Sequence, residues 1–482
     1  MDINLTSHQQ EIFDNILSVI QSKLSNVLRG TNIDDYLLSL TGSAGTGKTF
    51  LTTQISKYLK EKTDYSFTIT APTHKAVGVL ANILKDNKIE ANCKTIHSFL
   101  GIRPFKDFKT GEEVFTVDKT VKKKDTASLL IIDESSMISI KLYEYVLEAV
   151  EDGRVSLVLF IGDPYQLLPI DGSNPNIFNL QNSFKLTEIV RQAKDSYIIK
   201  LATKIRERIK NKNYINIKQF LQENQEEEIT YFHNKDDFLN DFYKNNQWHK
   251  ENKIVATHKN KDVDAFNRTI RNKYWSENGN STPPTLLAGD MLRFSDTYSV
   301  KDITLYHNGQ EIKLQSATLM YHETLQIDYW ECQAINSPQQ QIFRVVDPTS
   351  MKVFNDKLTF IANKAKKTGW PERKKLWFAF YQVRDMFANV QYIFSSTIHK
   401  LQGSTYDVSY IDMFSLAHNN YMSNDEKYRL LYVAVTRAKK DVKFFVSAFE
   451  ENSTSIENKY TKIVDVRENH ASIDNMLKEI VF

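Results

Sequence analysis

The chain has 482 residues, of which 41% are hydrophobic and 25% are charged, and these proportions are ordinary for a globular enzyme. Its 62 lysines and arginines against 59 acidic residues leave a net charge of only +3. This balance excludes a polybasic tail protein, although a local basic groove remains compatible with it. The sequence shows no apolar run of 18 residues, no signal-peptide pattern, and only two distant cysteines, Cys93 and Cys332. We therefore expect a multidomain cytoplasmic protein with no membrane partner and no disulfide framework.

Apolar strands alternate with amphipathic helices in the first 190 residues. The pattern predicts strands at 36–40, 66–70, 128–132 and 155–161, with helices at 49–60 and 75–85. Such alternation is typical of a parallel sheet covered by helices on both faces.

A hairpin is predicted within this first α/β series, between Phe99 and Phe115, with its turn at Lys109-Thr110-Gly111-Glu112. Aromatic side chains on such a hairpin can stack on bases, so Phe105 and Phe108 are candidate contacts to nucleic acid. The alternative is a surface hairpin whose aromatic side chains fill a small core. The lysines that follow, at positions 119 and 122–124, favour a solvated face that could touch a displaced strand.

A second α/β series is expected from about residue 252. Its predicted strands are 253–256, 391–394, 408–411 and 442–446, and its predicted helices are 262–275 and 426–435. Between them, short β-like pieces at 291–294, 304–306, 311–316, 329–335 and 342–346 predict a small barrel-like insert, followed by a helical stretch at 354–387. Residues 447–482 form a polar tail that ends in a short amphipathic stretch.

A phosphate-binding loop is predicted at Gly42-Ser43-Ala44-Gly45-Thr46-Gly47-Lys48-Thr49, because this segment follows a strand and opens a helix. The glycines let backbone N–H groups surround phosphate oxygens, and the helix N-terminus adds positive charge. Lys48 is expected to reach the β- and γ-phosphates, and Thr49 to bind Mg²⁺. A chance glycine-rich turn is the alternative.

Polar groups at the ends of the next strands fit the same chemistry. Asp133 is a second candidate Mg²⁺ ligand, and Glu134 a candidate for polarising the attacking water. Gln166 follows the next strand and could sense the γ-phosphate, because its amide both donates and accepts hydrogen bonds. Arg191 and Arg437 are candidate arginine fingers. The alternative for the acidic pair is a helix cap, and the alternative for Gln166 is a plain turn after a strand. For each arginine, the alternative is a solvated charge.

Seven segments, in this order along the chain, resemble the motifs of superfamily 1 helicases, specifically the RecD-like (1B) group. They are Leu5-Thr6-x-x-Gln9 (Q motif), residues 70–76 (Ia), 95–98 (Ib), 132–134 (II), 162–166 (III), 397–404 (V) and 432–438 (VI), besides the phosphate loop. The resemblance implies that Gln9 reads adenine and that Gly403 lies at the nucleotide. It leaves uncertain the role of Ser135, which departs from many relatives.

The resemblance also implies two RecA-like P-loop domains in tandem, with a pin hairpin inserted in the first and an SH3-like β insert plus a helical arm in the second. The expected boundaries are 1–95 with 120–190, the pin at 96–119, the second domain at 191–288 with 386–446, the insert at 289–385, and the tail. Trp370 and Trp377 of the arm are expected to be buried interface residues.

Nucleic-acid contacts are expected from both domains, since a motor must grip phosphates alternately. The candidates are Pro72, Thr73, His74, Lys75, His97 and Ser98 in the first domain, Thr397, His399 and Lys400 in the second, and Phe105 and Phe108 on the pin. Histidines in loops are as often structural hydrogen-bonding groups as ligands.

The expected function is an ATP- and Mg²⁺-dependent DNA helicase, and the resemblance to the RecD-like group implies 5′→3′ movement. Its expected partners are single-stranded DNA, duplex forks and a single-strand-binding protein, and we expect it to work as a monomer. Two alternatives remain open at this point. One is an RNA helicase, and the other is an ATP-switched remodeller of nucleic-acid complexes that does not unwind.

Overall fold

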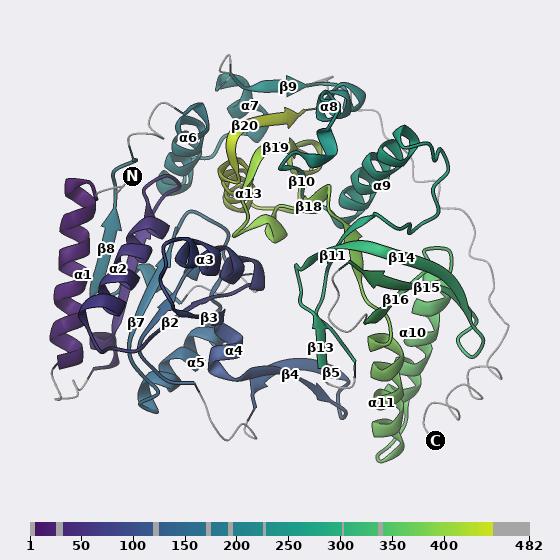
Figure 1. The fold of residues 1–482 in the computed structure, drawn as a ribbon, viewed down its shortest axis with the longest axis horizontal. Helices are drawn as coiled ribbons and strands as arrows, with labels where there is room; N and C mark the ends of the chain where they lie inside the picture. The colour runs from purple at the N-terminus through teal and green to yellow at the C-terminus, as the bar shows by residue number, and fades with distance from the viewer. Residues whose placement is uncertain are drawn as a thin grey trace. The chain divides into compact units, whose positions relative to one another are not determined.

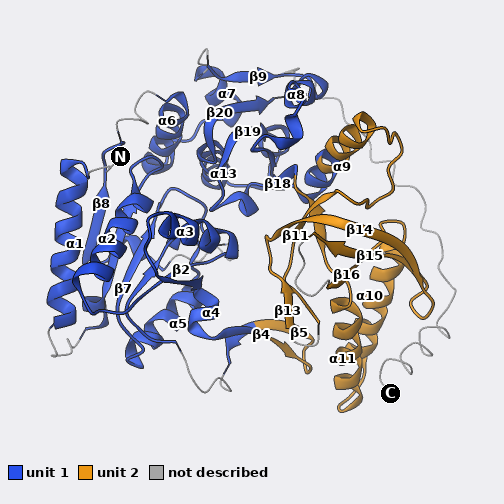
Figure 2. Ribbon diagram, viewed as in Figure 1, with its two compact units in different colours: residues 1–103, 115–266, 394–446 blue, residues 104–114, 267–393, 447–482 orange. Residues whose placement is uncertain are grey.

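The computed structural model describes residues 5–25, 32–118, 125–169, 175–190, 196–224, 228–300, 303–335 and 341–446. These residues form two compact units (Figures 1 and 2). Unit 1 contains residues up to 103, 115–266 and 394–446, and unit 2 contains 104–114 and 267–393. Among the described helices, none has the length and apolar character needed to cross a membrane.

The first domain of unit 1 is a six-stranded parallel sheet with strand order β3-β2-β6-β7-β1-β8. Its strands are β1 (Leu37–Gly42), β2 (Phe67–Ala71), β3 (Asn92–Thr95), β6 (Ala127–Ile132), β7 (Val155–Gly162) and β8 (Asn182–Leu186). Its helices are α1 (Ser7–Ser25), α2 (Lys48–Lys62), α3 (His74–Asp86), α4 (Ile96–Leu100) and α5 (Ile140–Glu151).

Helices cover both faces of this sheet, as the alternating strand pattern predicts. Leu129 and Ile131 of β6 pack into the core with α1, α2 and α3. Leu130 and Ile132 of the same strand pack into the core with α4 and α5. Successive strand side chains point to opposite faces, so a continuous apolar run is what a sheet covered on both faces requires.

The second domain of unit 1 is a five-stranded parallel sheet with strand order β18-β10-β19-β20-β9. Its strands are β9 (Thr230–Phe232), β10 (Lys253–Thr257), β18 (Ser395–Thr397), β19 (Tyr406–Asp412) and β20 (Ala438–Phe445). The accompanying helices are α6 (Tyr197–Asn211), α7 (Ile217–Glu223), α8 (Lys235–Phe242), α12 (Phe414–Ala417) and α13 (Asn424–Thr436). The two parallel sheets confirm the expected tandem α/β architecture.

Asp412 lies at the carboxyl end of β19, where burial raises the pKa of its carboxyl group to about 6. Its oxygens accept hydrogen bonds from the Phe414 N–H and the Thr257 hydroxyl. Because the folded protein holds this proton more tightly than the unfolded chain does, the ionised form reduces stability above pH 6, and this cost vanishes as the pH falls below about 4.

The substitution Asp412→Asn is therefore expected to increase the free energy of unfolding at pH 8, by about 3 kcal/mol at most. The gain should shrink steadily toward pH 4, because both proteins are then neutral at this position. Urea unfolding of the two proteins across this pH range measures it. A difference that is constant with pH would show that the Asp412 carboxyl is not perturbed.

Unit 2 is built on an antiparallel sheet with strand order β16-β15-β14-β11-β17. Its strands are β11 (Met291–Phe294), β14 (Glu311–His322), β15 (Ile327–Ala334), β16 (Ile342–Val346) and β17 (Val390–Tyr392), with a separate hairpin of β12 (Tyr298–Val300) and β13 (Ile303–Tyr306). The helices are the second half of α9 (Asn260–Glu277), α10 (Met351–Lys367) and α11 (Glu372–Asp385). The single helical stretch expected at 354–387 is thus a pair of helices, which we call the arm.

The strand predicted at 391–394 is divided in the structure. Gln391 and Tyr392 lie in β17, which pairs with β11 of unit 2, whereas the Phe394 carbonyl accepts the Val255 N–H of β10 in the second parallel sheet at 2.9 Å. The boundary of the insert expected at 289 stays a prediction, and unit 2 already includes residues from 267 onward. Arg271 is joined to this unit by a buried ion pair with Asp290 in which two N–H groups each donate at 2.8 Å. Trp275 donates to the same carboxylate at 2.8 Å.

The predicted hairpin is present as β4 (Ile102–Asp107) and β5 (Glu112–Val117), which we call the pin. Phe99 is not part of it, since this residue is buried in α4. Residues 104–114, including the apex, belong to unit 2. The lysines at 119 and 122–124 and the tail at 447–482 lie outside the described residues.

Candidate nucleotide site and nucleic-acid interface

The predicted phosphate loop connects β1 to α2. Gly45 and Gly47 adopt positive φ angles of 80° and 85°, which L-residues with a side chain rarely adopt. Lys48 opens α2, and its ammonium donates to the carbonyl oxygens of Gly42 at 2.6 Å and Ser43 at 3.1 Å. The Lys48 ammonium is therefore held at the phosphate loop, where a bound phosphate group would compete for it with these two carbonyl oxygens.

Gln9 supports this loop from α1. The residue is buried, its side-chain oxygen accepts the Thr6 N–H at 3.1 Å, and its amide donates to the Thr46 carbonyl at 3.1 Å. A Cβ on Gly47 would lie 2.4 Å from the same amide nitrogen. Gln9 thus positions the phosphate loop, a role that the sequence did not reveal, and its reading of adenine stays a prediction.

Asp133 and Glu134 lie at the carboxyl end of β6, beside the phosphate loop. Glu134 has a left-handed backbone (φ 53°), which is uncommon for a residue with a side chain and is a type of strain that clusters at functional sites. Its N–H donates to Asp133 Oδ1 at 2.9 Å. Burial, and then the charge of Glu134, raise the pKa of Asp133 to about 7.

This site fits a divalent cation, because positive charge stabilises the ionised form of the buried Asp133 carboxyl group. Among the described residues no three acidic, histidine or cysteine side chains come together. A cation there would be held by Asp133 and Thr49 together with phosphate oxygens and water, which is the usual way proteins hold Mg²⁺.

Two serines after Glu134 have structural roles. The hydroxyl of Ser135 donates to the Ile132 carbonyl at 2.7 Å and accepts the Ile161 N–H at 3.2 Å, so it ties β6 to β7. The Ser136 hydroxyl accepts from the Gln402 amide at 3.3 Å. The first serine therefore fixes the strand end that carries the acidic pair, and the second connects it to the other domain.

Motif III of the first domain is held directly by the second domain. The Gln402 amide donates to the side-chain oxygen of Gln166 at 3.0 Å, and both residues are buried. Arg429 of α13 donates to the carbonyl oxygens of Pro164 and Gln166, each at 2.8 Å. Gln166 is therefore placed to relate the state of the nucleotide site to the second sheet, and its contact with the γ-phosphate stays a prediction.

Tyr432 of α13 makes a buried contact between the two domains. Its hydroxyl donates to Asp163 Oδ2 at 2.6 Å and accepts the Ala44 N–H of the phosphate loop at 3.2 Å. Tyr432 and Asp163 are almost fully buried. One phenol thus joins motif VI to both the phosphate loop and motif III.

The substitution Tyr432→Phe should remove a donor from the buried Asp163 carboxylate, at a cost of about 1–3 kcal/mol in the free energy of unfolding. We expect the nucleic-acid-stimulated rate of ATP hydrolysis to fall more than the affinity for ATP. The matched control is Tyr428→Phe, one turn earlier in α13, where the lost hydroxyl bonds only to the Ile215 carbonyl of the second domain. Equal effects of the two substitutions on hydrolysis would argue against this role for Tyr432.

Of the two candidate arginine fingers, only Arg437 lies within the described residues. Arg437 is buried, and its guanidinium donates to the Val433 carbonyl at 3.1 Å, the Ser404 carbonyl at 3.2 Å and the Thr436 hydroxyl at 3.1 Å. It is therefore held within its own domain and would have to exchange these partners to reach a phosphate. Arg191 lies outside the described residues. Gly403 contacts the first domain, since a Cβ there would lie 3.3 Å from Ala76 Cβ.

The candidate nucleic-acid residues follow the carboxyl ends of β2, β3 and β18. Thr73 caps α3 by accepting the Ala76 N–H at 3.2 Å, and Thr397 accepts the Lys400 N–H at 3.4 Å. Pro72 and Lys75 are half-buried, whereas His74, Ser98 and Lys400 are exposed. The Lys75 ammonium donates to the Tyr406 hydroxyl at 3.2 Å, a further contact between the domains. The threonines thus shape the loops, and the exposed residues are the ones accessible to phosphates.

His97 and His399 of these loops are half-buried, unlike His74. His97 meets Phe115 of the pin edge-on at 5.9 Å between ring centroids, and His399 lies 6.3 Å from His258. Burial lowers the pKa of His97, and burial followed by the charge of His258 lowers that of His399. Both imidazoles are therefore neutral near pH 7, and their contacts to phosphate would be single hydrogen bonds.

The pin aromatics differ from one another. Phe105 is 56% exposed and free to meet a base. Phe108 packs on the arm, with ring centroids 6.3 Å from Phe378 and 6.1 Å from Tyr381. The expectation that both stack on bases therefore fits Phe105, while Phe108 belongs to the core between pin and arm. Of the two arm tryptophans, Trp377 is buried as expected, but Trp370 is 58% exposed, so that expectation is wrong.

The part of the pin that belongs to unit 2, residues 104–114, lies along α11. Next to the turn, Lys106 pairs with Asp385 at 2.5 Å and Glu113 with Arg384 at 2.9 Å. At the apex, Tyr381 donates to the Gly111 carbonyl at 3.0 Å. Gly111 has φ 77°, and a Cβ there would lie 2.1 Å from Cζ2 of Trp377.

The substitution Gly111→Ala is therefore expected to push the apex away from the arm. Hydrolysis stimulated by a single strand should persist, while duplex separation should fall several-fold, because the pin would no longer be rigid. Gly101→Ala is the matched control, since Gly101 has a similar φ of 75° but open space around a Cβ. Both variants share the cost of the left-handed backbone, so equal unwinding rates in the two would contradict this account.

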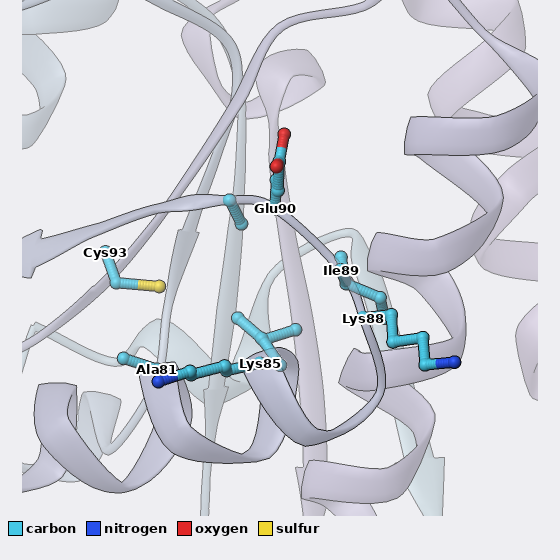
Figure 3. A pocket seen from close by; sticks show the side chains of 8 residues that line it. Ala81, Lys85, Lys88, Ile89, Glu90 and Cys93 are labelled. Carbon is cyan, nitrogen blue, oxygen red and sulfur yellow. The ribbon is translucent and has the colours of Figure 1, made fainter.

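A separate pocket lies beside β3, an edge strand of the first sheet, and its lining includes no residue of the phosphate loop (Figure 3). It lies where α3 ends and β3 begins, and is lined by Ala81, Leu84, Lys85, Lys88, Ile89, Glu90, Ala91 and Cys93. The phosphate loop, in contrast, follows the carboxyl end of a parallel strand. Burial raises the pKa of the Cys93 thiol, so this cysteine is a poor nucleophile.

The fold and site together define a P-loop protein with two α/β domains whose motifs meet at the phosphate loop. Family models match as an AAA domain over residues 25–225 and a UvrD-like helicase C-terminal domain over residues 392–444. The ATP-dependent DNA helicase dda of Enterobacteria phage T4 is 26% identical, and the alignment covers 92% of this chain and 99% of that protein. The chain is therefore similar over nearly its whole length to an ATP-dependent DNA helicase, and its residues 392–444 match a helicase domain.

Two other similar proteins complete the comparison. The uncharacterized protein R530 of Acanthamoeba polyphaga mimivirus is 25% identical, over 84% of this chain and 94% of its own. The crystal structure of Bacteroides Pif1 bound to single-stranded DNA is 18% identical, covers 92% of each chain, and has a TM-score of 0.47.

Proposed function

We propose that the protein is a Mg²⁺- and ATP-dependent DNA helicase that moves 5′→3′ along a single strand and separates a duplex. One observation carries this proposal: buried side chains of the second domain, Gln402 and Tyr432, hydrogen-bond directly to motif III and to the phosphate loop. A change at the nucleotide is thereby transmitted to the second sheet, as a two-domain motor requires.

Within this proposal the residues divide the chemistry as follows. Lys48 and the loop N–H groups hold the phosphates, and Thr49 and Asp133 hold the cation that neutralises them. Glu134 orients and polarises the attacking water. Arg437 exchanges its partners in the second domain for the transferring phosphoryl group, which couples hydrolysis to domain movement.

DNA as the nucleic acid is supported by the similarity to the phage T4 helicase. The exposed side chains at the carboxyl ends of both sheets would take turns in holding the strand while the domains open and close. We further propose that the protein works as a monomer in the cytoplasm, the host cytoplasm if it is phage-encoded, alongside a single-strand-binding protein.

The test is strand separation of forked substrates that differ only in the tail and the sugar. Rapid ATP-dependent separation is expected for a DNA duplex with a 5′ single-stranded tail, and little for one with a 3′ tail or for the all-RNA fork. Preference for the RNA fork would make the protein an RNA helicase. Stimulated hydrolysis without separation of any fork would make it a remodeller that does not unwind.

A further inference from the structure

The end of the arm carries a concentration of positive charge that the proposed nucleotide cycle does not use. Between residues 364 and 375, at the junction of α10 and α11, six basic residues stand against one acidic residue. These five net charges exceed the +3 of the entire chain. We call this group, Lys364, Lys366, Lys367, Arg373, Lys374 and Lys375, the arm-tip cluster.

Exposed aromatic side chains accompany these cations. Trp370 and Phe378 are 58% and 48% exposed. Lys374 lies between them in sequence, four residues from each, and its ammonium is 6.0 Å from the Trp370 ring centroid. Residues spaced by four share one helix face, so Lys374 and Phe378 follow one another along α11. Cations interleaved with exposed aromatic rings are typical of surfaces that bind nucleic acid.

The pin connects this cluster to the proposed site of strand separation. Arg373 donates to the Thr368 carbonyl at 2.8 Å and to the Lys109 carbonyl at the pin apex at 3.4 Å. Phe378 contacts Phe108 of the pin. All of these residues belong to unit 2, which is orange in Figure 2. The apex therefore ends beside the arm-tip cluster.

Two carboxylates where pin and arm meet pair with basic residues outside the arm-tip cluster, Asp385 with Lys106 and Glu113 with Arg384. Glu372 lies 3.3 Å from Lys375. Lys366, Lys367 and Lys374 are exposed, so their ammonium groups are accessible to an anionic polymer.

We propose that the arm-tip cluster binds the phosphate backbone of duplex DNA ahead of the pin. This inference rests on the proposed function, because the pin then marks the point where strands part and the duplex that is still paired lies beyond its apex. Duplex DNA carries one negative charge per about 1.7 Å of axis, a density that suits several lysines gathered where α10 ends and α11 begins. Trp370 adds an apolar contact for the sugars at the edge of the groove.

The test compares the triple substitution Lys366→Gln, Lys367→Gln and Lys374→Gln with a control of equal charge change. The control is Lys57→Gln, Lys60→Gln and Lys62→Gln, three exposed lysines of α2 in unit 1. Equilibrium affinity is measured without nucleotide, for a blunt duplex and for a single strand of the same length, at several salt concentrations.

The arm-tip variant is expected to lose about tenfold or more in affinity for the blunt duplex, with the slope of log affinity against log salt reduced by about 2.7. Its affinity for the single strand and its hydrolysis stimulated by a single strand should match those of the control. If the wild-type protein failed to separate any fork but this loss were observed, the proposed function would fall and the duplex site would stand.

Three results would overturn the duplex site. They are an unchanged affinity for the blunt duplex, an equal loss for single strand and duplex, and unchanged DNA binding together with lost binding of poly-glutamate. The last result would assign the cluster to acidic proteins.

Discussion

Glu134→Gln is expected to bind Mg²⁺ and ATP as the wild-type protein does and to hydrolyse ATP about 10²–10⁴-fold more slowly, the usual scale for a lost general base. The amide keeps the size of the side chain and cannot accept a proton from water. Asp133 and Thr49 remain available for the cation, and Lys48 for the phosphates. Binding of a fluorescent ATP analogue and steady-state hydrolysis with single-stranded DNA measure the two effects separately.

Lys48→Ala is the companion variant. It removes the ammonium that bonds to the phosphate loop, so both nucleotide binding and hydrolysis should be lost. Normal DNA-stimulated turnover in Glu134→Gln would remove Glu134 from the chemistry, and equal loss of binding in both variants would show that Glu134 acts by shaping the loop.

Arg437→Ala is expected to lower the rate of hydrolysis by roughly 10³-fold or more, the scale of a lost arginine finger, with a much smaller effect on DNA affinity. Arg437→Lys should recover only part of the rate, because an ammonium cannot reproduce the planar fork of the guanidinium. Steady-state hydrolysis and single-strand affinity are measured for each. Arg191→Ala is expected to behave like Arg437→Ala.

The buried contacts of Arg437 provide a check on this prediction. Its three acceptors all lie in the second domain, so an effect on folding would appear as a lower free energy of unfolding in both Arg437→Ala and Arg437→Lys. A variant that lost DNA affinity while keeping its turnover rate would instead make Arg437 a ligand of the DNA backbone.

The sequence was sufficient for the parts of the site that depend on local pattern. The phosphate loop and the acidic pair each follow a continuous apolar strand, and both strands lie in one parallel sheet, so their carboxyl ends meet. The strand β8 and the helix α1 were missed. In β8, Ser183 and Lys185 are exposed and only Leu186 is buried, and α1 begins in a polar segment.

Contacts between residues distant in sequence could not be read from the chain. The sequence pattern does not distinguish Phe105 from Phe108. In the structure, however, Phe108 contacts Phe378 and Tyr381, which lie about 270 residues later in the chain. Tyr432 stands in a recognised motif, but its hydroxyl finds Asp163 and Ala44 only after both domains have folded. For the same reason, the sequence motif identified Gln9 as a candidate but did not predict its hydrogen bond to the Thr46 carbonyl.

The most direct test of the central claim, a directional motor driven by ATP, is displacement of streptavidin from biotin at either end of single-stranded DNA. No duplex is present, so the measurement reports movement alone. A 5′→3′ motor should displace streptavidin rapidly from the 3′ end, only when Mg²⁺ and ATP are both supplied, and Glu134→Gln should not. Displacement from the 5′ end instead, or from neither end despite stimulated hydrolysis, would contradict the account.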